Sequence, residues 1–287
     1  MNEKSGLLAT GAAIVGRHKR YIVWFFILNL VLARMGASAF RVQAGHLLDH
    51  SLHADGLLRG FDWGIVGELL SNPGFGSTEA VTTPGMILAA LFAVVTLVIL
   101  PGVFLGYASL YRISRQEFFR ACGQNLWRFV RLAILFAIVA GIAAGILHGI
   151  FHALAKLADA SSYEKLPFYV HLIGFTLIFL VLTKIRIWFD LAEADVVVSD
   201  QLAVRKSLFK SIRQFRAQRF RLLGAYVAIS MVALLVLAIG VCVWNVAVPS
   251  ASIWGAFLIS QLILLLLLAA RFWQRAVAVS CLLRSRG

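Results

Sequence analysis

The chain has 287 residues, of which 61% are hydrophobic and 14% are charged, and its formal net charge at pH 7 is +14. Soluble domains carry about 25% charged residues, so the composition excludes an ordinary soluble globular protein and predicts a membrane protein. The basic residues flank apolar runs, where the positive-inside rule and anionic lipid account for them, so the positive charge does not indicate nucleic-acid binding.

The apolar runs predict an all-α polytopic bundle that forms a single transmembrane domain over residues 1–287. We expect six transmembrane helices, at about 21–40, 84–110, 129–154, 168–191, 221–248 and 253–275. Two short amphipathic pieces are expected near 43–53 and 61–71. In the second span, Pro101 predicts a kink, and broken helices mark the transport site of some transporters.

Two basic amphipathic segments are expected to lie along the membrane surface, at 115–127 and 202–216. Ser114 and Glu117 form the S-x-x-E pattern of a capping box before the first segment, and Ser199-Asp200 is a candidate N-cap for the second. Both segments carry basic residues that we expect to face anionic lipid: Arg115, Arg120, Arg128, Lys206, Lys210 and Arg213.

Small residues recur every four positions along the third span, at Ala137, Gly141, Gly145 and Gly149. This spacing places them on one face of a helix, where they let another helix approach closely. The row predicts a helix-packing seam. The packing partner is either another helix of the same bundle or a separate subunit.

Residues 118–132 align without gaps on residues 208–222, which indicates an internal repeat of a basic segment followed by a span. The first twenty residues and the first span resemble a third, degenerate copy. Lys and Arg lie mostly on one side of the six predicted spans, so the positive-inside rule predicts that both termini are cytoplasmic.

No nucleophile elbow, P-loop or intramembrane carboxylate pair is found, so no residue is predicted to be catalytic and the cofactor is unknown. Asp190, Glu193 and Asp195 are interpreted as ion-pair partners of the basic segments, with an i, i+4 pair between Arg186 and Asp190. The polar residues expected at mid-depth are Asn29 and Gln261, which argues against an ion-coupled transporter.

Two histidine pairs on the predicted outer side have the i, i+4 spacing with which one helix face can hold a metal. The candidates are His46, His50, His148 and His152. The alternative is that these rings bond water or backbone at the interface. The three cysteines form no C-x-x-C pair, so neither a disulfide framework nor a zinc knuckle is indicated.

The passage DLAEADVVVSDQLAVRKSLFKSIRQFRAQRFRLLGAYV, at 190–227, resembles a pattern in uncharacterised bacterial six-span membrane proteins. It is also similar to the membrane domain attached to some glycerophosphodiester phosphodiesterases. The resemblance covers about half of the chain and implies architecture only, since no phosphodiesterase domain is present. It implies a bacterial inner-membrane protein.

The first functional hypothesis is therefore a non-enzymatic scaffold or accessory subunit of the inner membrane. Its expected partners are anionic membrane lipids and either a membrane protein or further copies of itself, with no nucleic acid. The alternatives are a transporter of a small or lipid-like solute and a metal-dependent membrane enzyme that uses the outer histidines.

Overall fold

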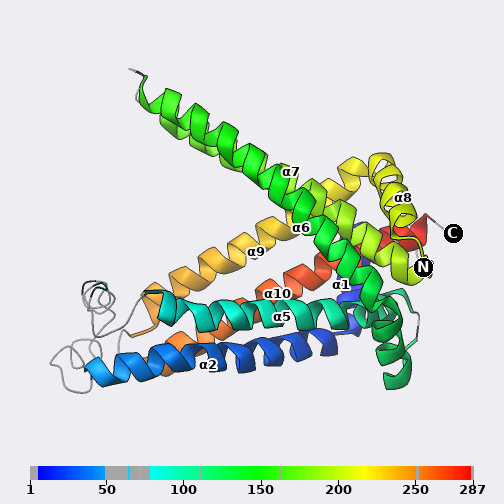
Figure 1. Cartoon of the computed structure of the whole chain (residues 1–287), viewed down its shortest axis with the longest axis horizontal. Helices are drawn as coiled ribbons and strands as arrows, with labels where there is room; N and C mark the ends of the chain where they lie inside the picture. The colour runs from blue at the N-terminus through cyan, green and yellow to red at the C-terminus, as the bar shows by residue number, and fades with distance from the viewer. Residues whose placement is uncertain are drawn as a thin grey trace. The chain divides into compact units, whose positions relative to one another are not determined.

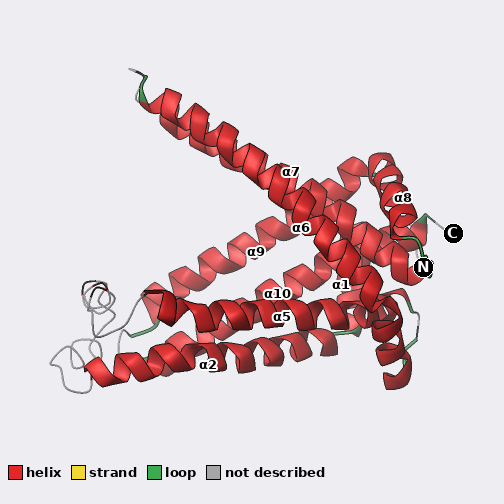
Figure 2. Cartoon of the chain, in the orientation of Figure 1, coloured by secondary structure: helices red, strands yellow, loops and turns green. Residues whose placement is uncertain are grey.

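The apolar runs of the sequence form long helices in the computed structural model of the chain (Figures 1 and 2). The structure describes residues 6–48, 64, 67, 71, 78–109, 111–161, 163, 165–249 and 252–285. These residues form no strand and eight helices: α1 (Leu7–Arg17), α2 (Arg20–Leu48), α5 (Thr78–Ala108), α6 (Arg115–Asp159), α7 (Leu166–Val198), α8 (Val204–Ala217), α9 (Arg219–Ala247) and α10 (Ile253–Arg284). The prediction of an all-α fold is confirmed.

Six of these helices are long and apolar enough to cross a membrane. The six candidate spans lie within Arg20–Ser38, Thr82–Ala108, Arg115–Asp159, Leu166–Val198, Arg219–Ala247 and Trp254–Arg284. This is the architecture of a multi-pass membrane protein. The predicted amphipathic piece at 43–53 is part of α2 up to Leu48. The piece at 61–71 lies outside the described residues except for 64, 67 and 71.

The chain divides into two units, and α5, α9 and α10 each run through both. Unit 1 comprises Met1–His18, Leu97–Ser230 and Trp273–Gly287. Unit 2 comprises Lys19–Thr96 and Met231–Phe272.

The core of unit 1 is built where α5, α6, α7, α9 and α10 bring large side chains together. Its fully buried members include Phe104, Phe129, Leu191 and Leu222. The helix α1 packs on the C-terminal part of α10, where Trp273 Nε1 donates a hydrogen bond to the carbonyl of Leu8 at 2.9 Å. The helix α1 and the C-terminal part of α10 therefore lie side by side in this unit (Figure 1).

Unit 2 is held by aromatic contacts and by close helix approach at glycine. The Phe25 ring lies edge-on to the rings of Phe92 and Phe272, with centroid distances of 6.4 and 5.0 Å. A Cβ added to Gly36 would lie 3.3 Å from Leu88, and a Cβ on Gly240 would collide with Ile263. These glycines let neighbouring helices approach more closely than any other residue would allow.

The predicted capping box at the start of α6 is confirmed. The Glu117 amide donates to Ser114 Oγ at 3.2 Å, and the Ser114 amide donates to the Glu117 carboxylate at 2.8 Å. From this cap, α6 continues for 45 residues without a break, so 115–127 is the start of the long helix and not a separate helix. Whether it lies along the membrane surface stays a prediction.

The predicted N-cap of α8 at Ser199-Asp200 is wrong. The cap residue is Ala203, which offers no side-chain acceptor, while Ser199 ends α7 and Asp200 adopts a positive φ of 46° in the turn. Ser199 lies four residues before the cap position of α8, so its oxygen cannot accept from the first amides of that helix. Its hydroxyl instead donates to Asp195 of α7 at 2.7 Å.

Two helix junctions of the chain share the same backbone geometry. The break between α8 and α9 falls at Gln218, with φ −123° and ψ 25°, and the break between α1 and α2 falls at His18, with φ −115° and ψ 30°. Each residue's amide bonds the carbonyls three and four residues earlier. The stretch of α6 that aligns on 208–222, residues 118–132, has no such break, so the internal repeat stays a prediction.

The Pro101-Gly102 pair supports a close helix contact. The helix α5 runs through Pro101, and both residues are buried. A Cβ added to Gly102 would lie 2.6 Å from the ring of Phe118, which is itself buried at the start of α6. Phe118 fills the place beside Gly102, which favours a structural role for this pair.

Replacing Gly102 with alanine is expected to destabilise the protein by about 1–3 kcal/mol, because the added methyl group overlaps the Phe118 ring. Gly123→Ala is the matched control, since a Cβ there meets nothing within 4 Å. Alanine in that helical position should stabilise by about 0.5–1 kcal/mol. Thermal unfolding of both variants in one detergent checks the difference, and equal shifts would contradict the contact.

Candidate functional site

The helices α6 and α7 form an antiparallel pair in unit 1. The ring of Phe151 on α6 packs on Gly174 of α7, where an added Cβ would collide with the ring. Further along the pair, the rings of Phe136 and Phe189 have centroids 5.2 Å apart. The guanidinium of Arg186 lies 5.1 Å from the centre of the Phe136 ring. This pairing fixes which part of α6 each residue of α7 faces.

Arg186 therefore lies inside the apolar part of the α6–α7 pair. Phe136 is five residues beyond Arg131, the last basic residue before the apolar run, which corresponds to about 8 Å along the helix. We expected Arg186 near the inner end of its span. The structure places it beside Phe136 and Ala140 of α6.

A buried charge cluster surrounds this arginine. We use that name for Arg186, Asp190, Glu193, Tyr226 and Arg275. Asp190 is fully buried, with Arg186 Nε 3.4 Å from one carboxylate oxygen and the Tyr226 hydroxyl donating to the other at 2.9 Å. Arg275, which is 6% exposed, lies close enough to Asp190 and Glu193 for direct electrostatic attraction. The predicted Arg186–Asp190 ion pair is confirmed.

The cluster holds two guanidinium groups and two carboxyl groups. Buried ions are tolerated in membrane helices when they pair with one another and face the protein interior. The buried Oε2 atom of Glu193 nevertheless accepts no hydrogen bond from the residues that the structure describes. The cluster adds buried charged groups that the sequence analysis did not anticipate beside Asn29 and Gln261.

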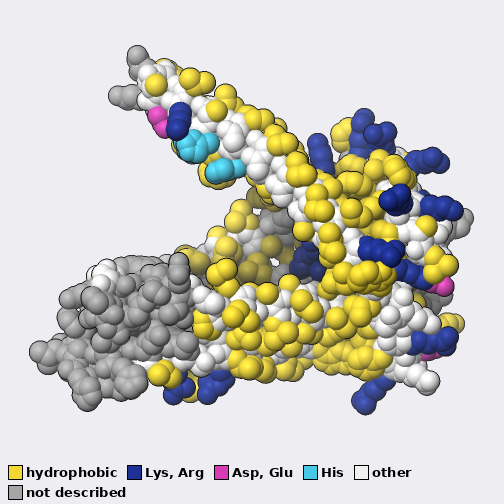
Figure 3. All heavy atoms as spheres, viewed as in Figure 1, with side chains coloured by type: hydrophobic (Ala, Val, Ile, Leu, Met, Phe, Trp, Pro, Cys, Tyr) yellow, Lys and Arg dark blue, Asp and Glu magenta, His cyan; other side chains and the backbone are white. Residues whose placement is uncertain are grey.

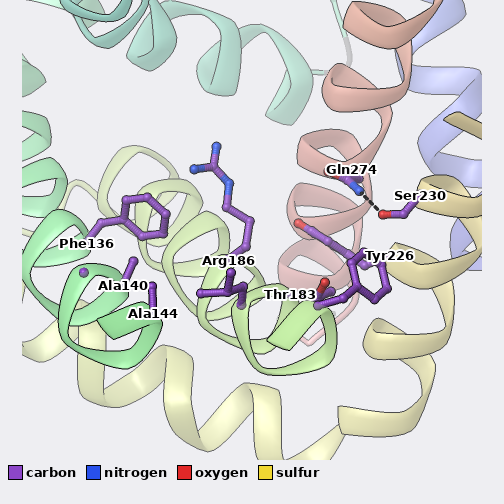
Figure 4. A pocket seen from close by; sticks show the side chains of 11 residues that line it. Phe136, Ala140, Ala144, Thr183, Arg186, Tyr226, Ser230 and Gln274 are labelled. Atoms are coloured by element: carbon purple, nitrogen blue, oxygen red, sulfur yellow. Dashed lines mark hydrogen bonds between the residues drawn. The ribbon is translucent and has the colours of Figure 1, made fainter. Parts of the chain in front are cut away.

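A pocket of about 580 Å³ opens beside the cluster. Its apolar lining consists of Phe136, Ala140, Gly141, Ala144, Phe179 and Leu182, and its polar lining consists of Thr183, Arg186, Tyr226, Ser230 and Gln274. In Figure 4, Arg186 extends between these two groups of side chains, with Phe136 and Ala140 on one side and Tyr226, Ser230 and Gln274 on the other. The pocket thus joins an apolar wall to a polar one at a single charged residue.

The second predicted ion-pair role, that of Asp195, is also confirmed. This carboxylate is 1% exposed and accepts hydrogen bonds from Ser199 Oγ at 2.7 Å, Ser207 Oγ at 2.9 Å and Lys210 Nζ at 2.6 Å. Ser207 and Lys210 belong to α8, so Asp195 fixes this basic helix to α7. The interpretation was wrong for Asp190 and Glu193, which face arginines of α7 and α10 instead of the basic segments.

The basic residues expected to face lipid divide into two groups. Arg115, Arg120, Lys206 and Arg213 are exposed. Arg128 and Lys210 instead bind carboxylates, with Arg128 2.8 Å from Asp200. In Figure 3 the Lys and Arg side chains gather over α8 and beside the start of α6. Lipid binding by this surface stays a prediction.

The small-residue seam of α6 lies open within unit 1. Its four members, Ala137, Gly141, Gly145 and Gly149, are all exposed. A Cβ built on any of the three glycines would meet no heavy atom within 4 Å outside its own helix. The face of α6 that contacts α7 is the neighbouring one, which carries Phe151. Docking of another helix on the seam stays a prediction.

The outer histidines are only partly described. His148 and His152 are exposed, with perpendicular rings 6.2 Å apart. His50 and the side chain of His46 lie outside the described residues. No group of three His, Cys, Asp or Glu side chains suited to a metal is found within the part of the chain that the structure describes. The shared metal site therefore stays a hypothesis.

Comparisons with protein-family models, curated proteins and solved structures give no match. The resemblance to the membrane domain of glycerophosphodiester phosphodiesterases is not tested by them. The candidate site therefore rests on its own geometry.

Sequence reasoning found part of this site and missed the rest. The spacing of Arg186 and Asp190 revealed their pair, but Tyr226 and Arg275 come from distant helices. The sequence did not mark Arg275 as buried, because a basic residue beside an apolar stretch is ordinarily an interfacial charge. In the structure this arginine and the four residues after it, Ala276, Val277, Ala278 and Val279, are all buried.

Proposed function

We propose that the protein is a non-enzymatic scaffold or accessory subunit that binds a membrane partner through the α6 seam. The observation that supports this most is the open space over Gly141, Gly145 and Gly149. Lipid gives helices no hydrophobic reason to associate, so close packing on small residues is a main source of helix–helix affinity. The open space at these three glycines offers this surface to another helix.

Site-specific photocrosslinking tests this proposal directly. A photoreactive amino acid at position 145 should crosslink to a membrane protein in native membranes, whereas the same residue at position 150 should not. Ile150 is a matched control because it is 54% exposed and lies on a different face of α6. Gly145→Leu should abolish the crosslinked partner seen from position 141, and Ile150→Ala should leave it. Equal crosslinking from positions 145 and 150 would sink the proposal.

The proposed location is a bacterial inner membrane, with both termini in the cytoplasm. This is supported by the excess of Lys and Arg on one side of the spans and by the gathering of basic side chains around α8 (Figure 3). Anionic lipid is the expected neighbour of the exposed residues Arg115, Arg120, Lys206 and Arg213.

Cysteine labelling tests the orientation. In a chain whose three cysteines are replaced by serine, Ala160→Cys should react with an impermeant maleimide from outside intact cells, whereas Arg216→Cys should react only after the membrane is opened. Both positions are exposed in the structure, so accessibility differs only by the side of the membrane. Labelling of Arg216→Cys in intact cells would contradict the predicted orientation and indicate the opposite one.

The second candidate function is carriage of a lipid-like solute, which the pocket beside Arg186 favours. A carrier must bind a solute in this pocket and release it again, whereas a scaffold has no such requirement. A transport assay in liposomes separates the two, because a scaffold moves no solute.

A further inference from the structure

The guanidinium of Arg186 has binding capacity that the protein does not use. Its ion pair with Asp190 is made through Nε, and its terminal nitrogens have no hydrogen-bond partner among the described residues. The guanidinium also lines the pocket and is the charged group of that lining. An arginine fork of this kind binds a carboxylate or phosphate through two parallel hydrogen bonds.

The charge facing the pocket is positive. Asp190 and Glu193 do not line it, and both oxygens of Asp190 are already engaged by Arg186 and Tyr226. The hydroxyls of Thr183 and Ser230 lie in the same wall and can donate to a second oxygen of an anion. A cation would meet no carboxylate on the lining, so the polar wall suits an anion.

The opposite wall suits an alkyl chain. Phe136, Ala140, Ala144, Phe179 and Leu182 present only carbon. From Phe179 to Arg186 the lining extends seven residues along α7, which corresponds to about 10 Å. The volume of about 580 Å³ lies within the range of about 300–1,000 Å³ typical of small-molecule sites. Gly141 and Phe179 are exposed, so a longer chain has an exit toward the surface.

We infer that this pocket binds an amphiphile with a single alkyl chain and an anionic head group, the head on Arg186 and the chain along Phe136 and Phe179. A docked protein helix fits less well, because its backbone offers no anion to the guanidinium. The inference goes beyond the proposed scaffold function, as it assigns a small ligand to a pocket that shares Gly141 with the seam.

Native mass spectrometry of the full chain in a neutral detergent tests the inference with three probes of equal chain length. These are palmitate, palmitoyl lysophosphatidic acid and the uncharged glycerol ester of palmitate. Palmitate or the lysophosphatidic acid should bind with one-to-one stoichiometry and at least about tenfold more tightly than the uncharged ester. Tighter binding of the first would indicate a free fatty acid as the ligand, and tighter binding of the second a lipid-derived phosphate. Equal binding of all three would overturn the inference.

Two variants and one control locate the site. Arg186→Gln should weaken binding of the preferred anionic probe at least about tenfold. Lys184→Gln removes the same charge from an exposed position two residues away and should leave binding unchanged. Ala140→Phe fills the chain part of the pocket while retaining every charge, so it carries the test if Arg186→Gln fails to fold. Undiminished binding to Ala140→Phe would place the probe elsewhere and refute the site. Loss of the amphiphile with an unchanged crosslink at position 145 would separate this result from the scaffold proposal.

Discussion

Asp190→Asn is expected to destabilise the protein by about 3–5 kcal/mol, because it leaves Arg186 and Arg275 without a full counter-charge in a water-poor interior. The carboxylate is fully buried and is contacted by Arg186 and Tyr226. Asparagine has nearly the same size, so packing is kept and the loss of charge is isolated. Thermal unfolding in a single detergent, followed by the fraction that remains monodisperse, measures the effect.

Asp200→Asn is the matched control for this prediction. Asp200 also binds an arginine, Arg128, at 2.8 Å, but its side chain is 85% exposed. Exposed ion pairs contribute about 0–1 kcal/mol, so this variant should unfold close to the parent protein. Adding Arg275→Met to Asp190→Asn should recover part of the lost stability. If the two asparagine variants behave alike, the cluster is not the buried ion network described above.

The second large effect is expected at Asp195, where alanine should release α8 from α7. Three donors converge on this buried carboxylate, and Ser207 is itself fully buried. Removing the carboxylate leaves the Ser207 hydroxyl without its acceptor, at a cost of about 1–3 kcal/mol, in addition to the loss of the Lys210 contact. Hydrogen–deuterium exchange of the α8 amides should accelerate, while exchange in α10 stays unchanged.

Lys206 and Lys210 provide a paired control within α8. Both are exposed lysines one turn apart, but only Lys210 reaches a carboxylate. Lys210→Gln should accelerate α8 exchange moderately, since the lysine is half exposed and solvent screens its ion pair. Lys206→Gln should leave exchange as it is. Faster exchange in both variants would point to loss of general surface charge and not to the Asp195 contact.

The sequence predicted those features that depend on residues close together in the chain. Six apolar runs became six long helices, and the Ser114–Glu117 box capped α6 as expected. The Arg186–Asp190 pair was found because both residues lie one turn apart on one helix. Each of these signals lies within one continuous segment of the chain.

The features that could not be predicted depend on which residues of one helix lie opposite which residues of another. Tyr226 and Arg275 join Asp190 only because α9 and α10 pack on α7 at that level. Ser199 was expected to cap α8 but ends α7 and donates to Asp195, because α8 begins only after Ala203. Periodicity shows which face of a helix is apolar, but it does not show which neighbour covers that face.

The open seam of α6 has a consequence for how the sequence can change over evolutionary time. Each glycine within a helix costs about 1 kcal/mol relative to alanine, and a Cβ on Gly141, Gly145 or Gly149 would meet no atom within 4 Å. The fold of unit 1 alone therefore gives no reason to keep glycine at these three positions. In a lineage in which nothing docks on the seam, mutation would drift toward alanine and the helix would become more stable. Glycine persists there only while selection for a close approach outweighs that gain.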